Sequence, residues 1–412
     1  MTDAFLERRR AAAAAAWDLD GEVVLVEAGA EIPVPGRGDR TYPFRSHSEY
    51  LYLTDRERPG GVLAYSPDDG WVEFVAPVTA EELLWTGLEG DREGVPEGTR
   101  PLDGLEAWAG GRPVRRLGAA DEADTELRDA LIRVRRPKDD VELERMRVAA
   151  EATRAGFEEL VPLIAAGRTE RELQVVLEAS FLSNGGDSLA FETILAAGDH
   201  AAVLHFSPAA RELRDRDLLL VDAGAEYRGY ASDVTRTYAV GGAFTAEQAL
   251  VHDTVRRAGE AAIDACRPGT AWHDVHVAAA LVVAEGLVEL GVLRGAPEML
   301  VESGAATLFF PHGVGHMVGL GVRDAGAASG ETREAEGGLP RLRVDITLEP
   351  RHGWTVEPGV YFVPALLDRA RGRDDVDWDR VDELHGFGGV RLEQNVLITD
   401  EGCEVLTAAI PL

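Results

Sequence analysis

Four carboxylates stand inside apolar, strand-like runs of this chain, where an isolated charge is costly to bury. Two belong to LLLVDAGAEYRGYASDVTRTYAV, and the others to WTVEPGVYF and GVRLEQNVLIT. In the first run, a hairpin that turns near Tyr227 and Arg228 would bring Asp222 opposite Asp233. Facing carboxylates repel unless a proton or a cation lies between them. The hairpin is therefore either a cation site or an exposed surface feature.

Two glutamates and a histidine strengthen the interpretation as a cation site. Glu357 and Glu393 each lie between apolar residues, and His316 lies in GVGHMVGLG, which is too rich in glycine for a helix and is expected as a strand or loop. The predicted metal ligands are Asp222, Asp233, His316, Glu357 and Glu393. Four carboxylates balance two divalent cations, and the oxygen-rich set favours Mn²⁺, with Zn²⁺ and Co²⁺ as alternatives. Two such metals can hold a bridging hydroxide and polarise a carbonyl, which is hydrolytic chemistry.

The composition argues against several kinds of partner. The 412 residues include 73 acidic and 42 basic ones, and the formal net charge of -31 repels nucleic acid and anionic lipid. No apolar stretch is long enough to cross a bilayer, and the N-terminus lacks a signal-peptide pattern. Two cysteines, Cys266 and Cys403, are too few for a disulfide framework. We therefore expect a cytoplasmic protein without nucleic-acid or membrane partners.

The length of the chain predicts two domains. After an alanine-rich opening helix, the runs EVVLVEAG, EYLYLTD, GGVLAYSP and WVEFVAP alternate with turn residues, which is typical of a mixed sheet in an α/β domain. Near Pro137 the apolar period becomes helical. We therefore predict an N-terminal domain over residues 1–136 and a catalytic domain over residues 137–412. The second should mix strands with long helices, among them residues 246 to 265 and 272 to 290, which makes the fold class α+β.

Four stretches resemble the pita-bread metallopeptidases of prolidase and aminopeptidase P type: VDAGAEYRGYASDVTRTY, PHGVGHMVGL, TVEPGVYF and FGGVRLEQN. The resemblance covers nearly the whole chain and includes the order of the five ligands. It implies a C-terminal catalytic domain of pita-bread (creatinase/aminopeptidase) fold and a smaller N-terminal α/β domain of creatinase type. It also implies two manganese ions, a homodimer, and a small peptide substrate that is cleaved at the bond before proline.

Within the family, LPRLRVDITLEPRHGWTVEPGVYFVPALLD resembles prolidase, so Xaa-Pro dipeptide cleavage is the predicted function. Prolidases have an arginine at the place of Arg343 that grips the C-terminal carboxylate of the substrate, a partner that suits a guanidinium fork. Three alternatives stay open: an aminopeptidase P that acts on longer peptides, hydrolysis of organophosphorus esters at the same metals, and a non-catalytic pita-bread binding protein.

The resemblance also implies roles around the metals. Glu357 would act as general acid and base, His205 would line the proline side of the site, and His312 would support the site from behind the ligands. Where these enzymes usually read GLDVHDVG, this chain reads GLGVRDAG, which places Arg323 at an expected histidine. Arginine keeps its charge, so Arg323 either clamps the substrate or pairs with an acid outside the site. The predicted catalytic residues are Glu357, His205 and Arg323, and the predicted substrate-binding residues are His205, His312, Arg323 and Arg343.

Overall fold

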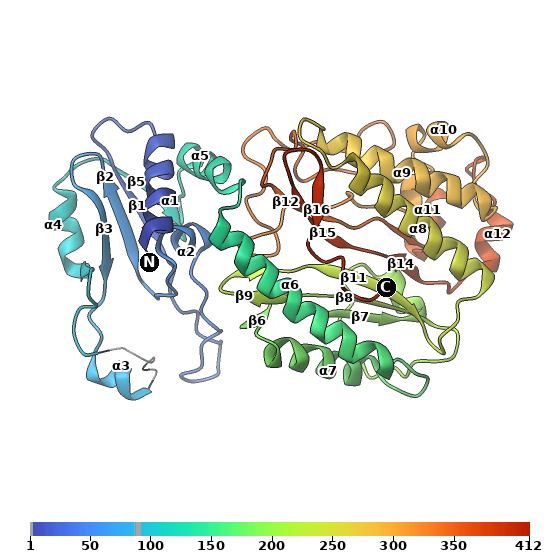
Figure 1. Ribbon diagram of the computed structural model, residues 1–412, viewed down its shortest axis with the longest axis horizontal. Coiled ribbons are helices and arrows are strands. Elements are labelled where there is room, and N and C mark those ends of the chain that lie inside the picture. Colours follow the sequence, from blue (N-terminus) through green and yellow to red (C-terminus); the bar gives the residue numbers. More distant parts are fainter. Residues whose placement is uncertain (1–2, 86, 88–91) are drawn as a thin grey trace. The chain divides into compact units, whose positions relative to one another are not determined.

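The computed structural model describes residues 3–85, 87 and 92–412 (Figure 1). The chain forms two compact units, Met1–Arg135 and Arg136–Leu412, which are described separately. Among the described residues, no helix combines the length and the apolar character that a membrane span requires.

The first unit is built on a mixed five-stranded sheet with the strand order β4-β3-β2-β1-β5. Neighbouring strands are antiparallel except for the pairs β1–β5 and β3–β4. The strands are β1 (Val23–Glu27), β2 (Val62–Ser66), β3 (Gly70–Val75), β4 (Arg100–Pro101) and β5 (Val114–Gly118). The helices are α1 (Asp3–Ala16), α2 (Ser48–Thr54), α3 (Ala80–Trp85), η1 (Leu102–Gly104), α4 (Leu105–Ala109) and α5 (Thr125–Arg135). Both the predicted opening helix and the mixed sheet are present.

The run EYLYLTD forms α2, so its prediction as part of the sheet is wrong. Tyr50 and Leu53 are fully buried and stand three residues apart, the spacing of one helix face. His47 caps the start of the helix by accepting a hydrogen bond from the backbone N–H of Glu49. Asp55 closes the other end in the left-handed conformation, and its N–H donates to the carbonyl of Leu51. These caps select the helix for a run whose apolar residues fit either structure.

The second unit contains two pairs of long helices, α6 with α7 and α8 with α9. Asp139 and Glu142 form a capping box at the start of α6, as Thr245 and Gln248 do for α8. The long helices are α6 (Asp140–Leu160), α7 (Glu170–Ser183), α8 (Ala246–Ala265) and α9 (Trp272–Glu289), of which α8 and α9 lie close to the predicted bounds. Shorter helices are η2 (Val161–Leu163), η3 (Gly198–Ala202), α10 (Pro297–Glu302), η4 (Ala306–Leu308), α11 (Pro364–Ala370) and α12 (Trp378–Glu383).

The strands of this unit form small antiparallel sheets with the orders β10-β9-β6, β11-β8-β7, β12-β15-β16 and β13-β14. Their bounds are β6 (Ser188–Leu189), β7 (Ile194–Ala197), β8 (Leu218–Ala223), β9 (Ala225–Tyr227), β10 (Tyr230–Ala231), β11 (Val234–Ala239), β12 (Gly353–Val356), β13 (Gly359–Tyr361), β14 (Gly389–Arg391), β15 (Gln394–Ile398) and β16 (Cys403–Val405). Helix α6 packs against β9 and β10, and α8 packs against β12, β13 and β14.

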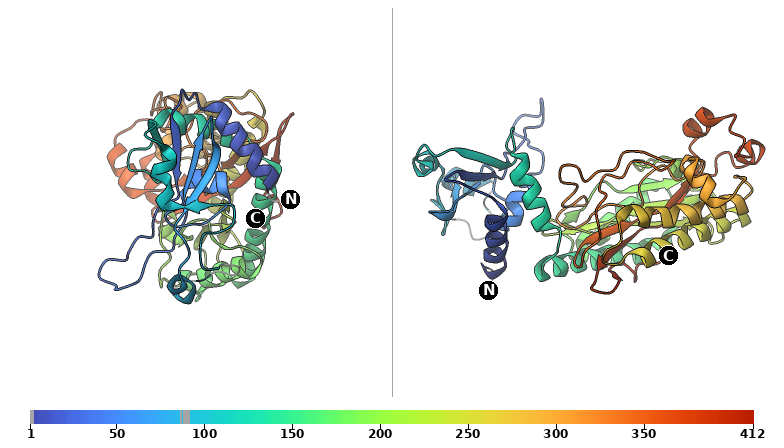
Figure 2. Two further views of the ribbon diagram at one scale, coloured as in Figure 1. Left: turned by 90° about the vertical axis from the view of Figure 1, so that its left-hand side faces the viewer. Right: turned by 90° about the horizontal axis from the view of Figure 1, so that it is seen from above.

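Two of these sheets meet where the predicted ligands lie. The backbone N–H of Glu393 donates to the carbonyl of Thr235 over 3.0 Å, and the hydroxyl of Thr237 donates to the carbonyl of Arg391 over 3.0 Å. These bonds join β11 to the last residue of β14 and to Glu393, which lies between β14 and β15, and Figure 2 shows the green and red strands running side by side in the view from above. Behind them, Trp272 of α9 stacks on Trp354 of β12 with ring centroids 4.0 Å apart. The packed core therefore fixes the strands that carry the site.

Candidate functional site

The two aspartates of the hairpin share one face of the sheet. In the pairing of β8 with β11, Asp222 lies opposite Thr235. Asp233 precedes Thr235 by two residues, which directs its side chain to the same face. The turn falls at Arg228 and Gly229, close to the predicted position. The prediction that the aspartates oppose each other directly is wrong by two residues, because the turn falls one residue later than predicted and the pairing of β9 with β10 continues the register of β8 with β11.

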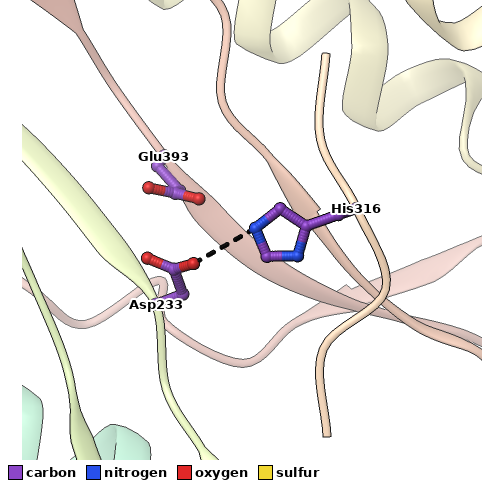
Figure 3. Close-up of side chains that lie close together, drawn as sticks. All are labelled: Asp233, His316 and Glu393. Carbon is purple, nitrogen blue, oxygen red and sulfur yellow. Dashed lines mark ion pairs between the residues drawn. The ribbon is translucent and has the colours of Figure 1, made fainter. Parts of the chain in front are cut away.

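Three predicted ligands point toward one another from different segments of the chain (Figure 3). The ligand atoms of Asp233, His316 and Glu393 all lie within 4.8 Å of one another. Nε2 of His316 is 3.3 Å from Oδ2 of Asp233 and 3.8 Å from Oε1 of Glu357. Asp222 lines the same cavity as these four residues. The fold thus brings all five predicted ligands to one cavity.

The imidazole of His316 is oriented by the backbone around it. Its Nδ1 lies 2.9 Å from the carbonyl oxygen of Met317, an acceptor, so Nδ1 carries the proton. The backbone N–H of His316 donates to the hydroxyl of Thr355 over 3.0 Å. The lone pair of Nε2 therefore faces the carboxylates, as in a histidine that binds a metal through Nε2.

The carboxylates carry more negative charge than their surroundings neutralise. Burial raises the pKa of Asp222 to about 7, although Arg391 opposes this, and the charge of Asp233 adds to the increase. Burial, followed by the charge of Asp233, also raises the pKa of Glu393 well above its ordinary value. Oδ1 of Asp222 is buried and accepts no hydrogen bond from the part of the chain that the structure describes. An unsatisfied oxygen within a buried anionic cluster is suited to a divalent cation, so the residues present fit a metal centre.

Arg391 is the residue of this site that the sequence analysis missed. Its guanidinium donates to Oδ2 of Asp222 over 2.5 Å, to the hydroxyl of Tyr361 over 2.8 Å and to the hydroxyl of Thr235 over 3.1 Å. Thr235 in turn donates to Oε2 of Glu393 over 2.7 Å. A signal was available, because Arg391 stands two residues before Glu393 in an apolar run and so belongs to the same face of an extended chain.

The ligands lie in a cavity of about 630 Å³, a volume typical of small-molecule sites. Its wall contains the remaining predicted site residues, His205, His312, Arg323 and Arg343. An apolar part is formed by Phe191, Ile194, Leu204 and Phe206. A cavity that combines an apolar wall, an anionic cluster and arginines can take a zwitterionic or peptide ligand.

The surroundings favour the neutral form of two histidines in the wall, His205 and His312. Burial lowers the pKa of His205, and the positive charges of Arg323, Arg391 and Arg343 lower it further. Burial and the charge of Arg391 lower the pKa of His312 to about 3. Nδ1 of His312 is 2.9 Å from the carbonyl oxygen of Gly313, and its Nε2 is 3.0 Å from the hydroxyl of Tyr361. Nε2 of His312 thus accepts a hydrogen bond from the hydroxyl of Tyr361, which itself accepts one from Arg391. His312 therefore supports the side chains behind the predicted ligands.

Arg323 and Arg343 are exposed residues of the cavity wall. Within the described part of the chain, neither guanidinium makes a hydrogen bond or an ion pair. Arg341, also in the wall, is paired with Glu334 at 3.3 Å. Among the described residues, Arg323 therefore has no acidic partner outside the site, and its contact with substrate stays a prediction.

Known proteins resemble the chain over almost its full length. It is 31% identical to a probable Xaa-Pro aminopeptidase PEPP of Coccidioides posadasii, over 98% of this chain and 93% of the relative. The structure of Pseudomonas aeruginosa aminopeptidase PepP is similar with a TM-score of 0.81 at 30% identity, covering 98% and 95% of the two chains. Aminopeptidase P of E. coli with the inhibitor Pro-Leu gives a TM-score of 0.84 at 27% identity, covering 100% and 96%.

These relatives are named aminopeptidases, so the prediction of prolidase as the main function is wrong. The alternative, aminopeptidase P, agrees with them. The segment that contains Arg341 and Arg343 resembles prolidase, and this local resemblance predicts a contact with a dipeptide carboxylate that the relatives do not support. Both arginines are exposed at the cavity, so that side of the site is open to solvent.

Two family assignments divide the chain in the order expected from its sequence. Residues 5–100 match the N-terminal domain of aminopeptidase P, and residues 144–400 match metallopeptidase family M24. The predicted fold, a pita-bread catalytic domain after a smaller α/β domain, is confirmed. The chain belongs to the Xaa-Pro peptidases of metallopeptidase family M24.

Proposed function

We propose that this protein is a metal-dependent Xaa-Pro aminopeptidase, which removes the first residue from peptides whose second residue is proline. The observation that carries the proposal is the similarity over nearly the full length to proteins named as aminopeptidases. The exposed arginines at the cavity wall support it, because an open side leaves room for residues that follow proline.

Five residues would hold two divalent ions in this enzyme: Asp222, Asp233, His316, Glu357 and Glu393. When bound, two such ions supply a nucleophilic water at neutral pH and polarise the carbonyl of the scissile bond. The ligands are oxygen atoms and one imidazole without thiolate, a set that favours Mn²⁺ over softer metals. Oδ1 of Asp222, which is buried without a hydrogen bond, supports its assignment as a ligand.

The remaining residues would bind the peptide and move its protons. Burial raises the pKa of Glu357, although the charges of His316 and Arg391 oppose the increase. A carboxyl group with a raised pKa can take a proton and deliver it to the leaving proline nitrogen. His205, neutral beside an apolar wall, would contact the proline residue. Arg323 would donate to a substrate oxygen, and Arg343 would contact the chain beyond proline.

A comparison of short peptides tests the proposal. The protein loaded with Mn²⁺ should cleave Ala-Pro-Ala at the first bond, and both Ala-Ala-Ala and the dipeptide Ala-Pro should react at least about 10-fold more slowly in kcat/KM. Treatment with EDTA should abolish turnover, and Mn²⁺ should restore it. Faster cleavage of Ala-Pro than of Ala-Pro-Ala, or full activity after EDTA treatment, would contradict the proposed function.

Substitution of Arg323 tests its assignment to the substrate. Arg323→Ala should lower kcat/KM for Ala-Pro-Ala about 10-fold with the metal content preserved, because a charge-assisted hydrogen bond contributes about 1.5–3 kcal/mol. Arg323→His should recover part of the loss and introduce a pH dependence near neutrality, since imidazole titrates there. Arg369→Ala is the matched control, because it removes an exposed arginine of α11 that does not line the cavity. Equal effects of the two alanine variants would remove Arg323 from the site.

Three finer predictions accompany this proposal. Manganese as the resident metal is supported by the ligand set, and a cytoplasmic location by the two cysteines, which are both free. The homodimer is supported only by the family resemblance. Metal analysis of the purified protein and a measurement of its mass in solution test the first and the third.

A further inference from the structure

Lys138 is the one lysine in a chain with 42 lysine and arginine residues, and it is buried. Its side chain is 0% exposed, and Nζ lies 2.7 Å from Oδ2 of Asp324, which is 1% exposed. Nζ also donates to the carbonyl of Arg136 over 3.1 Å. Every other Lys or Arg position in this chain is arginine, so the buried position 138 is the one place that carries the more compact ammonium group.

The partner of this lysine is the residue next to Arg323. The backbone N–H of Asp324 donates to the carbonyl of Met317 over 3.2 Å, which closes the segment from Met317 to Asp324 into a loop beside the ligand His316. Asp324 turns its carboxylate inward, and Arg323 lies exposed in the cavity wall. The buried pair therefore fixes the backbone at the residue that carries the guanidinium.

The side chains of Lys138 and Asp324 pack directly against Gly319 of this loop. A Cβ atom at Gly319 would clash with Oδ2 of Asp324 and lie 2.5 Å from Cε of Lys138. Ala325, which follows Asp324, has a φ of 38°, a left-handed conformation that is unfavourable for alanine. Gly319 leaves space for the ion pair, and Ala325 is held in a strained conformation. Both observations indicate that packing fixes the position of this loop.

Lys138 also ties this loop to the strand that leads to Glu357. The backbone N–H of Lys138 donates to the carbonyl of Arg351 over 2.9 Å, just before β12. Arg136 donates to the carbonyl of Gly326 over 3.3 Å, beyond Asp324. Residues 136 to 138 therefore contact both the loop that carries Arg323 and the segment that leads into β12 and on to Glu357, and they fix the two relative to each other. A buried ion pair seldom stabilises a fold more than apolar residues of equal size, so stability alone does not account for it.

We propose that Lys138 is a positioning residue for substrate binding: its ion pair with Asp324 holds the loop that presents Arg323 to the peptide. The inference rests on the proposed role of Arg323 in binding substrate. It assigns no contact between Lys138 and the substrate. Its effect on binding must therefore disappear when Arg323 is absent.

A double-mutant cycle measures this dependence. Lys138→Met should weaken binding of Pro-Leu to the metal-loaded protein, and lower kcat/KM for Ala-Pro-Ala, by about 5- to 10-fold. In the Arg323→Ala background, the same substitution should change both quantities by less than about 2-fold, because the residue it positions is gone. Lys138→Arg should resemble Lys138→Met despite its charge, because a guanidinium is larger and planar and the Lys138 side chain already packs against Gly319 in a fully buried place. Equal losses in both backgrounds overturn the proposal.

The single lysine permits a second measurement that does not depend on turnover. Protein grown with ¹³C-labelled lysine and loaded with diamagnetic Zn²⁺ should give one set of ε-CH₂ signals, from Lys138 alone. Pro-Leu should shift these signals in the wild-type protein and leave them unchanged in Arg323→Ala. A residue that only supports the fold would show no shift on binding, and that result would overturn the proposal.

Folding of the variants is controlled with a paired substitution. If Lys138→Met fails to fold because Asp324 is left buried without its partner, Lys138→Met/Asp324→Leu removes both charges and takes its place in the cycle.

The proposed aminopeptidase function and the proposed role of Lys138 are contradicted by different results. Absence of Ala-Pro-Ala cleavage by the wild type contradicts the proposed function, whereas the Pro-Leu cycle and the lysine signals still decide the role of Lys138. An Arg323→Ala variant that binds Pro-Leu as the wild type does overturns the positioning role.

Discussion

Glu393→Gln is expected to lower kcat/KM for Ala-Pro-Ala by about 1000-fold or more, equivalent to about 4 kcal/mol. Glu393 is 2% exposed, and Thr235 donates to its Oε2 over 2.7 Å. Glutamine has nearly the same shape and keeps the packing, but it removes one of the four negative charges that balance two divalent ions. The chain should therefore fold and lose metal, and with it the activated water.

The measurement combines kinetics with metal analysis of the same samples. Asp233→Asn should behave like Glu393→Gln, because Asp233 belongs to the same group of converging ligand atoms. Glu401→Gln is the matched control, since it makes the identical chemical change at an exposed residue. Full metal content with near wild-type turnover in Glu393→Gln would exclude this residue from the metal centre.

The residues that meet in the candidate site could be picked out from the sequence because charged residues inside apolar strands are rare and costly to bury. Asp222, Asp233, Glu357 and Glu393 each stand out against such a run, and pairwise repulsion then implies a cation. The register of the hairpin was not predictable to the residue, because a displacement of the turn by one residue, to Arg228 and Gly229, moves the paired residues by two. The run EYLYLTD was misassigned for a related reason, since its helix is decided by caps on either side.

The choice between dipeptidase and aminopeptidase needed information that no short motif contains. Both would use the same metal ligands, so the carboxylate and histidine motifs do not separate them. Chain-length preference depends on how much of the cavity stays open past proline, which is set by a long irregular segment that includes Arg341 and Arg343. The orientation of such arginines follows from tertiary packing, and the sequence pattern gave the wrong function here.

The role of Arg391 follows from the contacts of its buried guanidinium and could not be predicted from its position in the sequence. An arginine within a strand-like run is most often exposed, and only the contacts of its guanidinium reveal its purpose. Here three donors reach three different groups, Asp222, Tyr361 and Thr235. Since Tyr361 contacts His312 and Thr235 contacts Glu393, this one side chain connects both sides of the candidate centre.

Arg391→Met should lower kcat/KM for Ala-Pro-Ala by about 100-fold or more, because it leaves Asp222 and Tyr361 without their donor and removes the positive charge nearest the cluster. Without that charge the pKa of Asp222, already raised to about 7 by burial, should rise further. The protonated carboxyl is a poorer ligand, so metal affinity should also fall. Kinetics and metal titration at pH 6 and pH 8 check both effects, with the larger loss expected at pH 6.

Arg391→Lys separates charge from geometry at the same position. An ammonium keeps the positive charge near Asp222 but cannot span three acceptors in the way a planar guanidinium does. The lysine variant should therefore retain metal better than Arg391→Met and still lose about 10-fold in kcat/KM, because Tyr361 and Thr235 lose their fixed donor. Arg369→Met, at an exposed residue of α11, is the control for loss of one positive charge. An Arg391→Met variant within about 3-fold of the wild type at both pH values would mean that the buried guanidinium serves the fold alone.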